Sequence, residues 1–182
     1  MCCVSFAMSQ PHYAIVIHGG AGSLRPDQIS LQADSAYRTG LSHALSIGQN
    51  MLKDSATAIE VVQAVISALE DNELFNAGRG SVLTADGEVE MDASIMNGHD
   101  LSAGAVAGIR GVRNPIVLAD VVRRESPHVL LSGEGALTFA QHHRLDIEPA
   151  DYFITDEKRA AFKRIQASKK GTVGAVVLDL FG

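Results

Sequence analysis

The spacing of apolar and polar positions divides the chain into short apolar runs and longer stretches of helical periodicity. Residues 13–17 are an apolar run that stops at a glycine-rich sequence, which predicts a buried strand followed by a loop. The stretch 27–52 has helical spacing, although Gly40 and Gly48 argue against one unbroken helix.

The clearest helical pattern covers residues 58–69. Apolar positions recur there at intervals of three and four, so the helix has one continuous apolar face. We expect Asp54 or Ser55 to cap its first turn. An acidic turn follows, and we interpret Asp71 and Glu73 within it as solvated charges.

Glycine turns separate the next apolar runs. The pair Asp86-Gly87 predicts a hairpin between strands at 82–84 and 89–96. A run of small residues at 103–109 predicts a strand that another backbone or a helix can approach closely.

The second half of the chain returns to helical patterns. We expect helices at 114–124, with proline in the first turn, and at 132–143. Residues 156–170 are charged and predict a helix that passes into a linker, and 173–180 have the β-branched composition of a buried strand. This order of elements predicts an α/β or α+β layered fold.

Length and charge narrow the class of protein. With 182 residues, 46% of them hydrophobic, the chain is long enough for a core of its own. A net charge of −6 argues against nucleic acid as a partner, and we expect no membrane span or signal peptide. Cys2 and Cys3 are adjacent and predict neither a disulfide nor a zinc site, so we expect a cytoplasmic protein.

The glycine-rich sequence His18-Gly19-Gly20 has two open interpretations, a tight turn or the wall of an active site. It lacks the lysine of a phosphate-binding P-loop. It is similar to the oxyanion loop of α/β-hydrolases, but no Gly-x-Ser-x-Gly sequence supplies the nucleophile that such an enzyme needs. The histidines show no metal-binding spacing.

Asn76 is a polar amide in an apolar and glycine-rich run just past a predicted helix. From its residue type alone the turn interpretation is favoured over a positioned hydrogen-bonding group.

The sequence Gly171-Thr172-Val173 is the candidate for chemistry. If the bond before Thr172 is cut, that residue gains a free α-amine beside its hydroxyl. An α-amine has a pKa near 8, so roughly a tenth of it is unprotonated at pH 7 and can act as the base. Cleavage would thus create nucleophile and base in one step.

Together these motifs resemble the plant-type L-asparaginase/isoaspartyl peptidase family of N-terminal nucleophile hydrolases. The matching blocks follow the family's order over nearly the whole chain from residue 13 on. They are IVIHGGAG (15–22), LFNAGRGSV (74–82), EVEMDASIM (88–96), LSAGAVAG (101–108), NPI (114–116) and GTVGAV (171–176).

The resemblance implies a precursor that cuts itself between Gly171 and Thr172 and folds as an αββα sandwich. We divide the chain into an N-terminal extension (1–12), an α-subunit domain (13–150), a linker (151–171) and the first strand of the β part (172–182). The implied activity is hydrolysis of L-asparagine and β-aspartyl (isoaspartyl) dipeptides. The implied partners are these small substrates, the β part, and a second αβ unit in a dimer.

The resemblance also implies roles for individual residues. Thr172 would be the nucleophile, Asn76 would shape the site, and the loop of His18, Gly19 and Gly20 would pack near the scissile bond. A structural sodium ion, with no catalytic cofactor, would be held by main-chain carbonyls that fix Asn76 in place. The candidate donors are Leu69, Glu70, Asn72, Phe75, Ala77 and Arg79.

The family continues well past the nucleophile, whereas this sequence has 11 residues from Thr172 on. We therefore expect the 182 residues alone to be inactive. The alternative is a non-catalytic remnant that folds poorly or associates with a full-length homologue.

Overall fold

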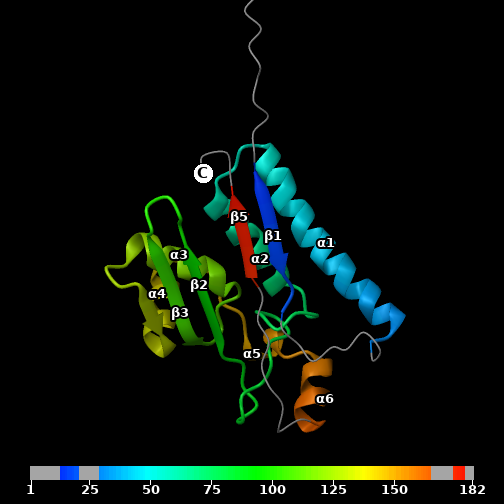
Figure 1. Ribbon diagram of the computed structural model, residues 1–182. Coiled ribbons are helices and arrows are strands. Elements are labelled where there is room, and N and C mark those ends of the chain that lie inside the picture. The colour runs from blue at the N-terminus through cyan, green and yellow to red at the C-terminus, as the bar shows by residue number, and fades with distance from the viewer. Residues whose placement is uncertain (1–12, 21–28, 165–173, 179–182) are drawn as a thin grey trace, which may run out of the picture.

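The computed structural model describes residues 13–20, 29–164 and 174–178, and it is a mixed α and β structure (Figure 1). The elements follow in the order β1 (Ala14–His18), α1 (Leu31–Lys53), α2 (Ala58–Glu70), β2 (Met91–Met96), β3 (Ala103–Ile109), α3 (Pro115–Glu125), β4 (Leu130–Ser132), α4 (Gly133–His142), α5 (Ala150–Phe153), α6 (Asp156–Arg164) and β5 (Gly174–Leu178).

The strands form two small sheets that lie next to each other (Figure 1). In one sheet, β1 pairs antiparallel with β5, and the register runs from Ala14 opposite Leu178 to His18 opposite Gly174. In the other sheet, β3 lies between β2, its antiparallel partner, and β4, its parallel partner. The end of β1 and the start of β5 therefore lie at the same end of their sheet.

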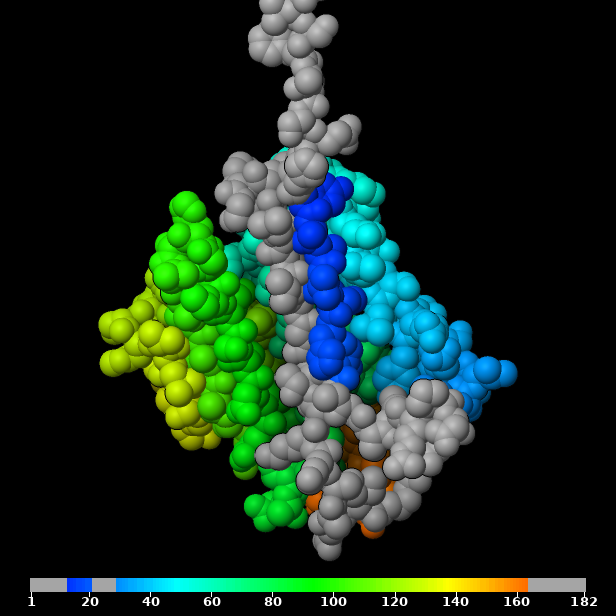
Figure 2. Space-filling view, viewed as in Figure 1, coloured from blue at the N-terminus to red at the C-terminus, as the bar shows by residue number. Residues whose placement is uncertain are grey.

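Helices cover one face of each sheet. In Figure 1, α2 lies behind β1 and β5, and α3 lies behind β2 and β3. The two helices also contact each other, so the core is one connected cluster that includes Val65 and Leu69 of α2 and Leu118 of α3. Figure 2 shows the opposite face, where β1 reaches the surface and Val16 is 66% exposed.

The helix α1 is unbroken in spite of its two glycines, and packing explains both. A Cβ at Gly40 would lie 2.8 Å from Nδ2 of Asn72, and one at Gly48 would collide with Ile15 and lie 2.9 Å from Val65. Each glycine therefore lets another element approach the helix backbone closely, which outweighs its low helix propensity.

The start of α2 differs from our expectation. Its cap is Thr57, whose hydroxyl accepts the Glu60 N–H while the Glu60 carboxylate accepts the Thr57 N–H. Asp54 instead ends α1, and Ser55 adopts a left-handed conformation at φ 65° in the link between the two helices. The expected cap at Asp54 or Ser55 was wrong because the reciprocal threonine–glutamate pair satisfies two backbone donors of the first turn at once.

The strand predictions are confirmed at 103–109 and for residues 174–178, but the strand at 82–84 was wrong. The turn at Asp86-Gly87 does form, with Gly87 N–H donating to Thr84 O at 3.0 Å. The Val82 N–H, however, donates to the side chain of Asn76 at 2.8 Å and so is not available to a strand partner. The short strand β4 was not predicted.

The other helix predictions, at 58–69, 114–124 and 132–143, are confirmed by α2, α3 and α4. The charged segment from residue 156 begins as the helix α6, as expected.

Within the described ranges, none of the helices combines the length and the apolar character that crossing a bilayer requires.

The packing at Gly48 yields a stability test. Gly48→Ala should destabilise the protein by about 1–3 kcal/mol, because the added methyl overpacks the contact with Ile15 and Val65. Gly135→Ala in α4 is the control, since nothing lies within 4 Å of its Cβ position, and it should stabilise by up to about 1 kcal/mol. Urea unfolding of both variants measures the difference, and equal effects of the two substitutions would contradict the packing account.

Candidate active site

The candidate site lies where β1 ends and β5 begins. His18 is the last residue of β1 and stands opposite Gly174, the first residue of β5. In the sequence, Gly174 follows Thr172 by two positions. The loop of His18, Gly19 and Gly20 thus begins beside the first residue of β5.

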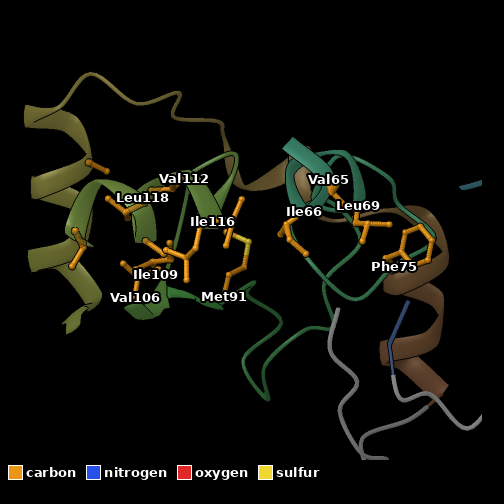
Figure 3. Packing of buried hydrophobic residues seen from close by; sticks show 14 of the residues in the cluster. Val65, Ile66, Leu69, Phe75, Met91, Val106, Ile109, Val112, Ile116 and Leu118 are labelled. Atoms are coloured by element: carbon orange, nitrogen blue, oxygen red, sulfur yellow. The ribbon is translucent and has the colours of Figure 1, made fainter. Parts of the chain in front are cut away.

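Phe75 brings a third segment to this place. Its side chain is 1% exposed, and its ring makes an edge contact with Tyr37, with centroids 5.9 Å apart. A Cβ at Gly19 would lie 3.3 Å from the Phe75 ring, and one at Gly40 would lie 3.1 Å from it. The ring therefore fills the space between the end of β1 and the helix α1, next to Leu69 (Figure 3).

Asn76 follows Phe75 directly, so the buried ring fixes the position of its backbone. The side-chain oxygen Oδ1 of Asn76 accepts the N–H of Val82 at 2.8 Å. This bond orients the amide across the loop. Asn76 lies in a bend of the chain, and its side chain is a positioned hydrogen-bonding group.

The loop from Leu69 to Gly80 is closed by backbone contacts. Arg79 N–H donates to Glu70 O at 2.7 Å, which joins the two ends. Gly78 and Gly80 have positive φ values of 52° and 97°, and a Cβ at either would collide with a backbone carbonyl, of Glu70 and Glu73 respectively. Only glycine allows this tight path.

The expected sodium donors all lie in this closed loop. The carbonyls of Glu70 and Asn72 accept the backbone N–H of Arg79 and of Phe75, whereas the Leu69 carbonyl accepts those of both Asp71 and Asn72. A carbonyl oxygen has two lone pairs, so those of Glu70 and Asn72 keep one that these bonds do not use. Uncharged oxygen ligands suit a hard cation, so these two carbonyls fit the group that the resemblance implies.

The side chain of Glu70 is buried at the junction of α2 and α3. Its Oε1 accepts the Ile116 N–H at 3.0 Å and so caps α3, whose own N-cap residue Asn114 makes no side-chain cap. Among the described residues Oε2 has no hydrogen-bond partner. Burial raises the pKa of Glu70 to about 8, against the lowering effect of the bond from Ile116.

A polar cluster that we did not predict surrounds Asp71, the residue after α2. Arg113 donates to both carboxylate oxygens, at 3.2 and 3.1 Å, and Asn114 and the Tyr152 hydroxyl each donate at 3.2 Å. Burial and the Asp71 charge raise the pKa of Tyr152, which keeps the hydroxyl a donor at neutral pH. Asp71 is exposed, in agreement with its interpretation as a solvated charge, but it also binds partners 42 or more positions away in the chain, which the sequence did not predict.

The structure thus brings together most of the residues that we singled out. His18, Gly19 and Gly20 lie beside Phe75, which precedes Asn76, and the candidate sodium donors form the rest of the same loop. Gly171 and Thr172 lie outside the described residues. Their predicted roles stay predictions.

Known proteins of one family are similar to this chain in sequence. The family described as Asparaginase matches residues 11–170. The isoaspartyl peptidase/L-asparaginase of Bos taurus is 41% identical over 178 residues, which cover 92% of this chain and 56% of that protein. The isoaspartyl peptidase of Escherichia coli K12 is 41% identical over 184 residues, covering 92% and 57% respectively, and the human isoaspartyl peptidase/L-asparaginase is 38% identical over 178 residues, covering 92% and 56%.

The match to the family defines the class of protein. This chain belongs to the asparaginase family, as both the match over most of its length and the identity to these relatives establish. It spans about half the length of the curated relatives that it matches.

The cap that Glu70 provides can be tested by substitution. Glu70→Ala should destabilise the protein by about 1–3 kcal/mol, because it leaves the Ile116 N–H buried without a partner. Glu70→Gln keeps an acceptor at the same position and should cost clearly less. Denaturant unfolding gives both values, and an equal loss in the two variants would show that the hydrogen bond is not what Glu70 contributes.

Proposed function

We propose that this chain is the first part of an amidohydrolase precursor that cuts itself before Thr172 and then hydrolyses L-asparagine and β-aspartyl dipeptides. One observation carries the proposal. The register pairs His18 with Gly174, which follows Thr172 by two positions in the sequence, and Phe75 packs against Gly19 and so joins the loop of Asn76 to the end of β1. The printed names of the relatives, isoaspartyl peptidase and L-asparaginase, support the substrate class.

The chemistry follows from the two groups that cleavage gives to one residue. The Thr172 hydroxyl oxygen attacks the side-chain amide carbonyl of the substrate while the free α-amine of Thr172 takes up the hydroxyl proton. The tetrahedral intermediate collapses to an ester with Thr172, and the resulting ammonium group returns the proton to the departing amine. Water then attacks the ester, the α-amine again accepts and returns a proton, and aspartate is released.

Asn76 and the loop of His18, Gly19 and Gly20 shape this site in our proposal. The Asn76 Oδ1 already accepts the Val82 N–H, so its amide is oriented before a substrate arrives. Such preorganisation lowers the cost of binding and reaction, because no group has to be fixed at that moment.

We propose that the structure is one half of an αββα sandwich, which the β part completes and which then forms a dimer of αβ units. The outer face of β1 supports this, because Val16 is exposed on it and no described helix or strand covers it (Figure 2). A hollow of about 620 Å³ supports it too. It lies between α2 and the sheet of β2, β3 and β4, and its lining includes Ile59 and Val62 on one side and Met96, Ala103 and Val129 on the other. A reducing, cytoplasmic setting agrees with this proposal.

A sodium ion in the loop from Leu69 to Arg79 is part of the proposal. It would bind main-chain carbonyls of this loop and so keep Asn76 in place. The collisions that a Cβ would cause at Gly78 and Gly80 support a loop with a single conformation.

The role of Thr172 is tested in a form of the protein that continues through the second part of the relatives' length. Thr172→Ala should abolish the cut and lower turnover of a β-aspartyl dipeptide by several orders of magnitude, on the order of 10⁶ where a hydrolase loses its nucleophile. Intact-mass spectrometry detects the cut, and amine release detects turnover. The 182 residues alone should show no turnover.

The control for this test is Thr138→Ala. Thr138 is an exposed threonine of α4 whose hydroxyl donates to Glu134 O, and its loss should leave both readouts unchanged. Cleavage or turnover that survives Thr172→Ala would refute the proposal.

The sodium site is tested by melting the chain in sodium chloride and in choline chloride at equal ionic strength. At a sodium concentration 100 times Kd, binding should stabilise the fold by about 2.7 kcal/mol and raise Tm accordingly. The gain should disappear in Gly78→Ala, where the added methyl disturbs the loop, but persist in Gly98→Ala, where the Cβ position is open. Equal Tm values in the two salts would rule the ion out.

A further inference from the structure

The short helix α5 holds the site loop at its start. The Tyr152 hydroxyl donates to Asp71 Oδ1 at 3.2 Å, and Asp71 is the first residue of the segment 71–80, the part of the loop that follows α2. The guanidinium carbons of Arg79 and Arg113 each lie 5.7 Å from the centroid of the Tyr152 ring. One tyrosine thus touches the first residue of the loop through its hydroxyl and a residue near the end of the loop through its ring.

The same helix also holds the loop at its end. Gly80 N–H donates to Phe153 O at 3.0 Å, and the Phe153 side chain is anchored in the core at 1% exposure. Upstream of α5 the chain is fixed as well, because Glu148 N–H donates to Gly111 O at 2.8 Å and Val112 bridges to Ile147. The position of α5 is therefore set by the rest of the fold.

These contacts leave Asn76 in the middle of a segment whose two ends are attached to one four-residue helix. We propose that Tyr152 is a positioning residue, which clasps the loop 71–80 and thereby holds the Asn76 amide in its working orientation. This inference rests on the proposed role of Asn76.

The polar contacts of Tyr152 distinguish a positioning residue from an ordinary core residue. Phe153 supplies the apolar anchor of α5, whereas Tyr152 is only half-buried and faces a carboxylate and two guanidinium groups. A residue needed for burial alone would have no use for this hydroxyl. Tyr152 is also at the start of the chain segment that leads to the cleavage site, so the clasp connects that segment to the loop.

The test uses hydrogen exchange of single amides in the 182-residue chain, measured by NMR. The Gly80 amide reports the bond to Phe153, the Val82 amide reports the Asn76 side chain, and the Val65 amide in α2 reports the core. Tyr152→Leu removes hydroxyl and ring, and should speed exchange at Gly80 and Val82 by about tenfold or more while Val65 is unchanged.

Two variants complete the test. Tyr152→Phe keeps the ring and loses one hydrogen bond, so it should speed the exchange of the two loop amides by only about threefold, a partial rescue. Tyr13→Phe is the matched control outside the clasp and should change none of the three amides. If Tyr152→Leu does not fold, the same comparison is made with Tyr152→Phe and Arg79→Gln.

Unchanged exchange at Gly80 and Val82 would overturn the proposal. An equal acceleration of all three amides would overturn it too, because Tyr152 would then stabilise the whole fold and not the loop. These exchange rates do not depend on turnover. A negative result would therefore not contradict the proposed nucleophile, and a failure of the nucleophile proposal would not contradict the role of Tyr152.

Discussion

The insertion of the Phe75 ring between two glycines is the contact on which the arrangement of the site depends. Gly19 at the end of β1 and Gly40 in α1 have no side chain, and the ring lies 3.3 and 3.1 Å from where their Cβ atoms would be, next to Leu41 and Asn72 respectively. Because the ring is fully buried, leaving this position would expose a large apolar surface to water. Asn76, the next residue, therefore has little freedom relative to the end of β1.

Polar contacts then determine the course of the loop that Phe75 anchors. Glu70 reaches from the end of α2 to the first turn of α3, so the same residue ends one helix with its backbone and caps another with its side chain. Asp71 gathers donors from the start of α3 and from α5. Burial of the Phe75 ring thus fixes where the loop lies, and the hydrogen bonds of the Glu70 and Asp71 carboxylates fix the path that it follows.

Periodicity was enough to predict most of the longer helices and strands from the sequence, whereas the cap of α2 and the strand at 82–84 were predicted wrongly and β4 was missed. The apolar face of α2 and the proline at the start of α3 act over a few residues, so the chain itself displays them. The space at Gly40 and Gly48 could not be predicted, because it depends on residues far away in the chain that pack against α1. The contact of Asp71 with Tyr152 spans 81 positions and has no local pattern. The sequence indicated Asn76 as a candidate, but its hydrogen-bond partner, the Val82 N–H, could not be predicted because it depends on the path of the loop.

The most direct test of the account is the proximity of the Phe75 ring to Gly19, measured by nuclear Overhauser effects in a chain with labelled phenylalanine. The account predicts strong effects between the Phe75 ring protons and both the Gly19 Hα and the Leu41 methyls, which meet at this point. Their absence, together with a Phe75 ring whose protons contact only solvent and loop residues, would contradict it.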